Sequence, residues 1–458
     1  MIEKKQIYFL GIGGIGMSAI ARYFYTLGYP VAGYDRFRND ICINMENIGI
    51  NIHYEDDITK IPYQFKNKKT TLVVFTPAVP QDHNELLFFR TNNFEILKRS
   101  EVLGLISNSK KCMAIAGAHG KTSVSSICAN IMVNTKAGCS AFLGGIAKNF
   151  NSNLVINKNS DYVVVEADEF DRSFLRLTPS TALITYIDSD HLDIYNNYNT
   201  LFEAFVQFGN LVKTNGNLIL NHNISEDYIK HIRTDINIYR YGLNNKECDF
   251  YIDNIKYQEN KCYFDLTHIN GKISDISYSA GGDHNLENAL AGASISILNG
   301  ATDEDVRKGL ETFEGVERRF DIKIKTDNFI YIDDYAHHPN EISAFLKSVR
   351  LIFPDKKITG IFQPHLYSRT RDFYKEFAES LSICDEIILL PIYPAREKPI
   401  EGITSEIILA NIKKTKKFIC EKNELIPFLK KQKPEILVTM GAGDIDQLIK
   451  PIITEFEK

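Results

Sequence analysis

The sequence predicts an α/β protein built from three domains. Short apolar strands alternate with segments of helical spacing along most of the chain, which is typical of parallel sheets covered by helices on both faces. A glycine-rich turn follows such a strand twice, at 11–16 and at 117–123. The length of 458 residues exceeds one ordinary core, and roughly 150 residues per domain suggests three. We place the domains at 1–108, 109–318 and 319–458.

Composition and charge favour a globular protein of the cytoplasm. The chain is 44% hydrophobic and 24% charged. Its net charge of −5 gives no general attraction for nucleic acid, so an anionic ligand must be bound by local features. The eight cysteines are scattered without a CxxC pair, which indicates reduced thiols. No segment reaches the ~20 uninterrupted apolar residues of a membrane span.

The first domain begins with a strand, a turn and a helix. Residues 6–10 form an apolar run, and residues 17–28 have helical spacing and end at a glycine. Apolar runs at 30–35 and 71–75 predict further strands, and residues 85–107 have helical spacing throughout. This alternation predicts a parallel sheet.

The first glycine turn fits the pattern GxGxxG, and Asp35 closes the next strand 19 residues after Gly16. Glycines permit a tight turn and let backbone N–H groups and the helix N-terminus approach a diphosphate. The motif alone does not distinguish NAD from a UDP-sugar. The residues it places at a substrate are Gly11, Gly13, Gly14, Ile15, Gly16 and Asp35.

The second glycine turn predicts a loop for the phosphates of a nucleotide. It ends an apolar strand at 111–117 and opens a helix, and it reads Gly117, Ala118, His119, Gly120, Lys121, Thr122 and Ser123. Backbone N–H groups would hold the phosphates, Lys121 would neutralise charge near the β and γ phosphates, and a hydroxyl from Thr122 or Ser123 would complete a Mg²⁺ shell. Ile115 stands where the first glycine of the usual motif belongs.

Acidic residues follow two consecutive predicted strands. The first group is Glu166, Asp168, Glu169 and Asp171, and the second is Asp188, Asp190, His191 and Asp193. Mg²⁺ prefers oxygen ligands, and strand ends that face a nucleotide are where it is held. The alternative is that these carboxylates are only solvated loop residues.

The rest of the chain predicts a meander and a further α/β unit. Residues 246–280 alternate and are rich in Tyr, Ile and Thr, which predicts a small antiparallel meander appended to the central domain. Four apolar strands with helical segments between them follow, at 328–336, 357–365, 386–393 and 435–443.

Polar motifs in the last half include two neighbouring histidines and two arginines. His337 and His338 stand before a proline; without a second ligand group at the right spacing, we favour a substrate or nucleotide contact over a zinc site. Arg369 and Arg371 follow an apolar strand, and arginine suits a carboxylate or phosphate unless it forms a surface ion pair.

Taken together, the motifs resemble the Mur ligase superfamily. They occur in the order GIGGIGMSAIA, AGAHGKTS, VEADEFDRSFL, IDSDHLD, GGDHNLENALA, GVERRF, DDYAHHPNE, FQPHLYSRTRDF and MGAGD, over residues 11–444. The resemblance implies a three-domain architecture, with a Rossmann-like N-terminal domain, a P-loop central ATPase domain and an α/β C-terminal domain. It implies an ATP- and Mg²⁺-dependent ligase of peptidoglycan synthesis, a monomer or dimer, that joins L-alanine to the carboxylate of UDP-N-acetylmuramate through an acyl phosphate.

The resemblance also implies roles for single residues. Catalysis would depend on Lys121, Arg319 and His191. ATP would meet Gly117, Ala118, His119, Gly120, Lys121, Thr122, Ser123, Asn288, Arg319 and Asp334. Metal ligands would be Thr122, Ser123, Glu166 and His191, and further substrate contacts would be His337, His365, Arg369 and Arg371. The chain departs from the family pattern at Ala118, Phe170 and Gly281, where Thr, Ser and Pro are usual.

Three alternatives stay open. A related ligase attaches a recycled peptide to the same UDP-sugar and shares the ATP chemistry. An NAD-dependent dehydrogenase would use the first glycine turn but leaves the GKT loop and the acidic groups unexplained. A catalytically silent binding protein is disfavoured by the intact Lys121, Glu166 and His191. No residue is nominated as the base that takes the ammonium proton.

Overall fold

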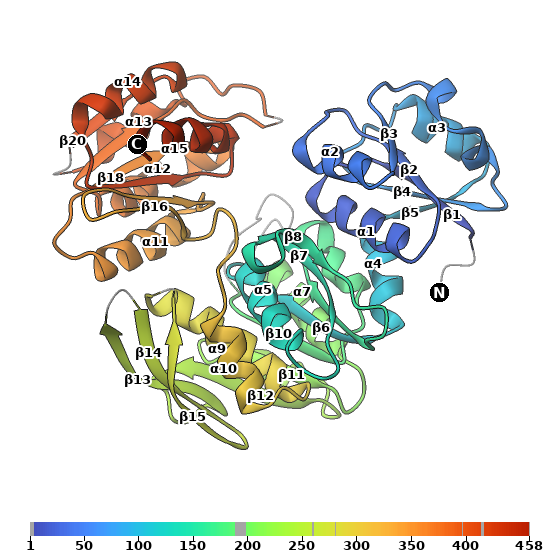
Figure 1. Ribbon diagram of the computed structural model, residues 1–458, viewed down its shortest axis with the longest axis horizontal. Helices are drawn as coiled ribbons and strands as arrows, with labels where there is room; N and C mark the ends of the chain where they lie inside the picture. Colours follow the sequence, from blue (N-terminus) through green and yellow to red (C-terminus); the bar gives the residue numbers. More distant parts are fainter. Residues whose placement is uncertain are drawn as a thin grey trace. The chain divides into compact units, whose positions relative to one another are not determined.

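The described part of the chain contains three β-sheets, each with helices packed on it. The computed structural model describes residues 4–187, 198–258, 261–279, 281–395, 397–413 and 416–457. Within these residues the strands form three sheets with helices packed on them, so the predicted fold class is confirmed (Figure 1). The chain divides into two compact units: the first is Met1–Ile255, Tyr263–Ser277 and Glu287–Glu314, and the second is Lys256–Cys262, Tyr278–Leu286 and Gly315–Lys458. The three domain boundaries given above remain predictions.

The first sheet is parallel, with strand order β3-β2-β1-β4-β5. Its strands are β1 (Gln6–Leu10), β2 (Val31–Tyr34), β3 (Asn51–His53), β4 (Thr71–Phe75) and β5 (Glu95–Lys98). The order reverses between β1 and β4, so the turn after β1 lies at the switch point where such sheets bind ligands. One face packs on α1 (Ile15–Thr26), α2 (Asp40–Asn47) and α4 (Arg99–Asn108), and the other on α3 (Asn84–Thr91), η1 (Ile58–Lys60) and η2 (Tyr63–Lys66).

Two strands of this sheet are absent from the sequence prediction. The prediction of helical structure throughout 85–107 is wrong in the middle, because α3 ends at Thr91 and β5 precedes α4. Asn93 has a φ of +57°, a left-handed conformation that ends a helix. Both β3 and β5 are short and contain no fully buried residue, so neither gives a long apolar run.

The central sheet has the order β15-β14-β13-β12-β11-β10-β6-β9-β7-β8 in the described residues. Its strands are β6 (Lys111–Ala116), β7 (Ser140–Ala147), β8 (Ser152–Val155), β9 (Tyr162–Glu166), β10 (Thr181–Ile184), β11 (Asn217–Asn221), β12 (Asn237–Leu243), β13 (Phe250–Gln258), β14 (Lys261–His268) and β15 (Gly271–Tyr278). Helices α5 (Lys121–Met132), α7 (Tyr198–Asn210), α8 (Glu226–Lys230), α9 (Asp283–Leu298) and α10 (Asp303–Glu311) complete this part. The predicted meander corresponds to β13, β14 and β15, which extend the central sheet instead of forming a separate one.

The first sheet and the central sheet share one hydrophobic core. Helix α1 packs against β7 and β8, and the core cluster includes residues of both sheets, among them Phe9, Ile20 and Val165. The Arg22 guanidinium donates to Ser152 Oγ at 3.1 Å and to Asn153 Oδ1 at 3.3 Å. Both glycine turns therefore belong to one compact unit.

The third sheet has the order β16-β17-β21-β18-β19-β20. Its strands are β16 (Asp321–Lys325), β17 (Ile330–Asp334), β18 (Ile358–Phe362), β19 (Glu386–Leu389), β20 (Lys416–Ile419) and β21 (Ile436–Met440). Helices α11 (Pro339–Ile352), α12 (Tyr367–Leu381), α13 (Ser405–Asn411), α14 (Lys422–Gln432) and α15 (Ile449–Phe456) pack on both faces. The four predicted strands are β17, β18, β19 and β21, whereas the two outer strands, which are lysine-containing and less buried, are absent from the prediction.

The cysteines and the lengths of the helices can be compared with the sequence prediction. All eight cysteines are buried free thiols, as the scattered spacing indicates. None of the helices in the described part of the chain is both long enough and apolar enough to cross a bilayer.

Candidate active site

The phosphate-type loop joins β6 to α5 and depends on two left-handed glycines. Gly117 has a φ of +132° and Gly120, the residue before α5, has a φ of +83°. A methyl group added to Gly117 would lie 2.1 Å from Thr185 Oγ1, so the loop packs tightly on the end of β10. Only glycine fits this conformation and this space. The first turn of α5 thus presents its backbone N–H groups where a phosphate would be bound.

Lys121 lies folded over this loop as an ammonium ion. Its Nζ donates to Gly117 O at 2.7 Å, to Glu169 Oε1 at 2.8 Å and to Ala118 O at 3.4 Å. Burial alone would lower the pKa of Lys121, but the carboxylate of Glu169, followed by that of Asp168, holds it above the ordinary value. A fixed positive charge therefore lies at the mouth of the loop.

Thr122 and Glu166 bring two side-chain oxygens together beside the loop. Thr122 Oγ1 donates to Glu166 Oε1 at 3.2 Å, and Gly144 N–H donates to Glu166 Oε2 at 2.9 Å. Because β6 and β9 are parallel neighbours, with Ile115 opposite Glu166, their carboxyl ends bring loop and carboxylate together. A hydroxyl and a carboxylate are donors that suit Mg²⁺. Of the two predicted hydroxyls, that of Thr122 lies against Glu166.

Asn288 of α9 is also part of this site. It is 4% exposed, and its Oδ1 lies 2.5 Å from where a methyl group on Gly120 would be. The carbonyl of His119 accepts a hydrogen bond from Thr185 Oγ1. Lys121, Thr122, Glu166 and Asn288 therefore lie around the loop, whereas His191 lies outside the described residues.

The first glycine turn is supported by Asp35. Gly13 N–H donates to Asp35 Oδ2 at 2.6 Å, and Phe37 N–H donates to Asp35 Oδ1 at 3.1 Å. Asn39 Nδ2 donates to Gly13 O at 3.3 Å. Asp35 thus lies where the sequence predicts, and its hydrogen bonds hold the turn in shape.

Arg99 lies beside the first glycine turn, although no sequence motif singles it out. A methyl group on Gly16 would lie 2.7 Å from Arg99 Nη1, so the guanidinium lies beside the first turn of α1. Arg99 Nη2 also lies 3.9 Å from Asp168 Oδ2, in the acidic segment after β9. Arg99 is the first residue of α4 and follows β5, so recognising that strand would have placed an arginine at the carboxyl edge of the sheet.

In the second unit, Asp334 and Arg319 are close in space. Asp334 accepts hydrogen bonds from Phe320 N–H at 2.7 Å and Ala336 N–H at 2.8 Å. Burial raises the pKa of Asp334 to about 6, although the charge of Arg319 opposes this. The Arg319 guanidinium lies 5.1 Å from the centre of the Tyr335 ring.

Three of the remaining predicted residues gather in this unit. The rings of His337 and His365 are 6.1 Å apart, and His365 stacks on Tyr393 at 5.7 Å. Burial, followed by the charge of Arg369, lowers the pKa of His365 to about 4, so it is neutral near pH 7. Arg371, in contrast, is half exposed, and its guanidinium pairs with the neighbouring Asp372 at 2.7 Å.

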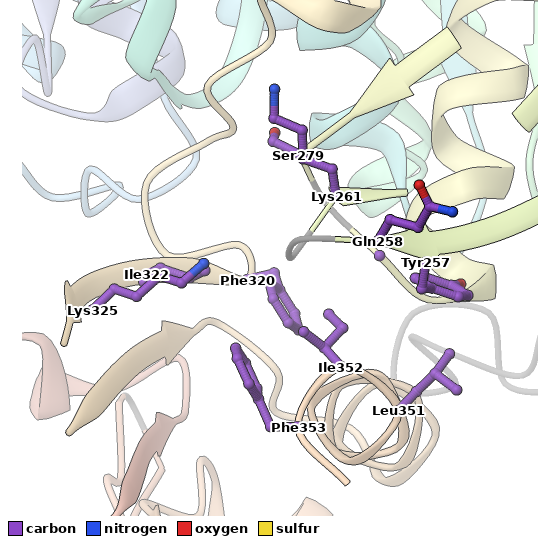
Figure 2. A pocket seen from close by; sticks show the side chains of 11 residues that line it. Tyr257, Gln258, Lys261, Ser279, Phe320, Ile322, Lys325, Leu351, Ile352 and Phe353 are labelled. Atoms are coloured by element: carbon purple, nitrogen blue, oxygen red, sulfur yellow. The ribbon is translucent and has the colours of Figure 1, made fainter. Parts of the chain in front are cut away.

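A cavity of ≈ 190 Å³ also lies in the second unit (Figure 2). Apolar side chains, among them Tyr257, Phe320 and Phe353, line it together with Lys261 and Lys325. None of the predicted site residues contributes to its wall. The cavity therefore does not define the candidate site.

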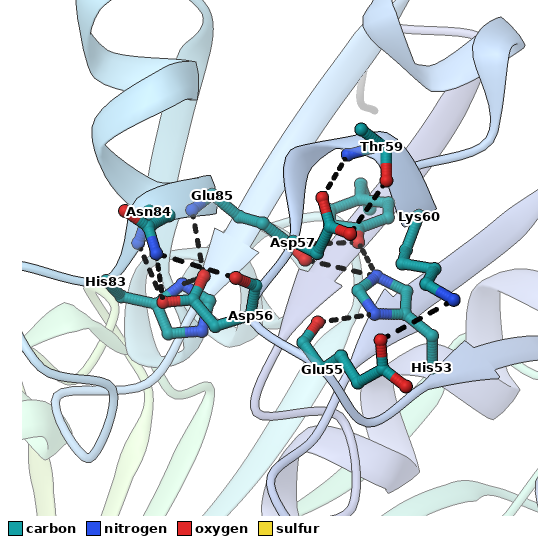
Figure 3. Close-up of polar contacts among 10 residues, drawn as sticks. His53, Glu55, Asp56, Asp57, Thr59, Lys60, His83, Asn84 and Glu85 are labelled. Carbon is teal, nitrogen blue, oxygen red and sulfur yellow. Dashed lines mark hydrogen bonds and ion pairs between the residues drawn. The ribbon is translucent and has the colours of Figure 1, made fainter.

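A separate polar cluster lies in the N-terminal domain (Figure 3). Asp56 accepts hydrogen bonds from the backbone N–H groups of Asn84 at 3.0 Å and Glu85 at 3.2 Å, at the start of α3. Glu85 is fully buried; Tyr8 OH donates to its Oε2 at 2.7 Å, and His53 Nε2 lies 3.2 Å from its Oε1. Burial raises the pKa of Glu85 to about 8. This carboxyl is therefore kept as a neutral acid at moderate pH.

Protein-family models match three consecutive stretches of the chain. The Mur ligase family catalytic domain matches residues 6–111, the Mur ligase middle domain matches residues 115–296, and the Mur ligase glutamate ligase domain matches residues 318–443. Both glycine turns and the acidic segment after β9 fall in the first two stretches.

Curated relatives and solved structures agree with these matches. The chain is 45% identical over 450 residues to the UDP-N-acetylmuramate–L-alanine ligase of Parabacteroides distasonis, covering 98% of this chain and 97% of the relative. It is 44% identical over 449 residues to that of Phocaeicola vulgatus, with the same coverage of 98% and 97%. A crystal structure of the UDP-N-acetylmuramate–alanine ligase of Thermotoga maritima covers 99% of each chain, with a TM-score of 0.80 and 25% identity. A murein peptide ligase of Psychrobacter arcticus covers 98% of each chain, with a TM-score of 0.71 and 21% identity.

Proposed function

Because this chain belongs to the Mur ligase family, we propose that it is an ATP- and Mg²⁺-dependent ligase that joins L-alanine to the carboxylate of UDP-N-acetylmuramate in peptidoglycan synthesis. The observation that carries the proposal is the ammonium of Lys121, held on a glycine loop beside the oxygens of Thr122 and Glu166. A site of this kind suits a nucleoside triphosphate with its metal.

The first glycine turn binds the UDP part of the sugar substrate. Backbone N–H groups around Gly14 and the N-terminus of α1 face the diphosphate, and the Arg99 guanidinium beside Gly16 supplies the positive charge. The sugar's carboxylate then extends toward the phosphate-type loop of the same unit. Arg99 also pairs with Asp168, so it lies between the two loops.

The reaction needs a better leaving group on the carboxylate, because amide formation from a carboxylate is uphill in water. The sugar's carboxylate attacks the γ-phosphate of ATP, which gives an acyl phosphate and ADP; the amine of L-alanine then displaces phosphate. Lys121 neutralises the charge that develops on the transferred phosphoryl group, and catalysis is mostly positioning and charge stabilisation. Mg²⁺, held by Thr122 and Glu166, supplies further neutralisation of the phosphates when it is bound.

We assign nucleotide contacts to Asn288, Arg319 and Asp334 on the family pattern alone. Arg369 offers a guanidinium to a carboxylate, and His365, being neutral, offers an uncharged ring nitrogen beside it. We assign a metal role to His191 and a substrate role to His337 and Arg371 on the family pattern alone.

L-alanine is favoured over a recycled peptide as the amine. The curated relatives at 41–45% identity are named as L-alanine ligases, whereas the murein peptide ligase is 21% identical and supports only the fold. The test is phosphate release from ATP with UDP-N-acetylmuramate across a panel of amino acids and a tripeptide. We expect release only with L-alanine or close analogues. Equal release with the tripeptide, or release without the UDP-sugar, would overturn the proposal.

A further inference from the structure

The Lys121 ammonium donates to three acceptors of the protein itself. Two are the loop's own carbonyls, those of Gly117 and Ala118, and the third is the Glu169 carboxylate. A lysine ammonium has three donors and no acceptor. Contact with the oxygens of a terminal phosphate therefore requires that at least one of these bonds is exchanged.

Of the three hydrogen bonds, a phosphate can replace the one to Glu169, because both groups offer negatively charged oxygen acceptors. The side chain of Glu169 is 2% exposed and that of Lys121 is 13% exposed, so this ion pair is shielded from water. Breaking such a pair without a substitute is strongly unfavourable, because it leaves a buried charge uncompensated. A phosphate group provides the substitute for the lysine, since it brings negative charge and oxygen acceptors.

The neighbouring carboxylates make different contacts. Glu166 faces the hydroxyl of Thr122 and the N–H of Gly144, and Asp168 lies near Arg99. Glu169, in contrast, forms an ion pair with Lys121 at 2.8 Å. Glu169 lies three residues beyond the end of β9, whereas Glu166 is the last residue of that strand.

We propose that Glu169 is a positioning residue for Lys121: it holds the ammonium at the mouth of the loop in the nucleotide-free protein and yields it to the phosphates of ATP. The proposal rests on the proposed function, in which Lys121 binds those phosphates. In this arrangement Glu169 competes with the nucleotide for the same cation. It keeps the lysine ordered before ATP arrives, and it weakens nucleotide binding by the strength of the pair that must be exchanged.

The variant Glu169→Gln tests this competition by the direction in which the affinity for nucleotide changes. The amide keeps the size of the side chain and removes its charge, so MgADP should bind about tenfold more tightly in calorimetry, the effect of a charge-assisted hydrogen bond. A side chain that merely supports the loop would give weaker binding when changed. Unchanged or weaker MgADP binding by a folded Glu169→Gln protein would overturn the proposal.

Asp168→Asn is the matched control, since Asp168 acts on Lys121 through its charge, whereas Glu169 also accepts a hydrogen bond from it. We expect its MgADP affinity to stay within about twofold of the wild type, because interactions between partly exposed charges are screened. An equal tightening in both variants would mean that general negative charge, not the Glu169 contact, opposes the nucleotide, and would also overturn the proposal.

The wild-type protein gives a second test that does not depend on a variant folding. In a crystal structure with Mg²⁺ and the β,γ-imido analogue of ATP, the Lys121 ammonium should contact phosphate oxygens and should no longer contact Glu169. An ammonium that still holds Glu169 while the phosphates are bound would contradict the exchange. Lys121→Ala separates the two proposals: normal MgADP binding by that variant would defeat the role of Lys121, whereas lost binding with an unaltered Glu169→Gln affinity would defeat only the exchange.

Discussion

The two glycine turns of this chain are built alike and charged differently. Each follows the carboxyl end of a parallel strand and opens a helix, and each has a carboxylate within contact. In the second turn the cation, Lys121, is part of the loop itself. In the first, the cation is Arg99, which a different strand and helix bring to Gly16. A loop with its own lysine suits a phosphate that is transferred, whereas a turn with an external guanidinium suits a diphosphate that is only held.

The same contrast extends to two buried glutamates. Glu169 is paired with an ammonium, whereas Glu85 is surrounded by the Tyr8 hydroxyl, the His53 ring and nearby Asp56. A cation lets a buried carboxyl stay ionised, whereas burial without one raises its pKa. In the central domain a buried carboxyl lies beside a cation, whereas in the N-terminal domain burial raises the pKa of a carboxyl that has no such neighbour within hydrogen-bonding distance in the described contacts.

The largest expected effect comes from removing the cation of the second turn. Lys121→Ala should lower ADP formation by about 10³-fold, the size of effect seen when one donor to developing charge is lost. The circular dichroism spectrum should stay close to that of the wild type, whereas the apparent melting temperature should fall, because the variant leaves the buried Glu169 carboxylate without its cation. Turnover within tenfold of the wild type would refute the role of Lys121.

Adding one methyl group to each turn should separate their mechanical roles. In Gly117→Ala the methyl meets Thr185 Oγ1 at 2.1 Å and the backbone nitrogen of Tyr186 at 2.9 Å, in a left-handed conformation. We expect a loss of about 2–5 kcal/mol in unfolding free energy and no ATP turnover. In Gly16→Ala the nearest atom is Arg99 Nη1 at 2.7 Å, the end of a flexible side chain that can move.

Gly16→Ala should therefore leave thermal stability nearly unchanged while it weakens binding of the UDP-sugar. Melting curves of the two variants, recorded beside steady-state kinetics, provide the measurement. If both methyl groups lowered the melting temperature equally, the turns would not differ in the way that their packing indicates.

A smaller effect is expected from the external cation. Arg99→Ala should raise the KM for UDP-N-acetylmuramate by about 10–100-fold, since a hydrogen bond to a charged group typically contributes this much. The KM for ATP should change much less, because Lys121 is untouched. Arg99→Lys keeps the charge without the planar fork and should recover part of the loss. A rise in the KM for ATP alone would place Arg99 at the nucleotide instead.

The sequence predicts local features of the site well and long-range ones poorly. Lys121 and Thr122 belong to one continuous motif, so their neighbourhood follows from the sequence of a single loop. Arg99 reaches Gly16 only through β5, a short strand without a buried apolar run, and no local pattern signals it. The partner of Glu169 is likewise set by the parallel pairing of β6 with β9, which no local pattern specifies.

The buried acid of the N-terminal domain should influence stability as pH changes. Burial raises the pKa of Glu85 from 4.5 to about 8, so the folded protein binds a proton there that the unfolded chain releases above about pH 4.5. The stability that this group contributes is fully present below pH 4.5 and is lost as pH rises toward 8. The slope is at most about 1.4 kcal/mol per pH unit.

Glu85→Gln removes that pH dependence, and the amide oxygen of the glutamine can still accept a hydrogen bond from the Tyr8 hydroxyl. Chemical denaturation at several pH values should give wild type and variant similar stability near pH 5 and a more stable variant near pH 8. Burial lowers the pKa of His53, and this neighbour is present in both proteins. Parallel profiles would mean that Glu85 is ionised in the fold, and the contrast with Glu169 would then fail, because both glutamates would hold a buried charge.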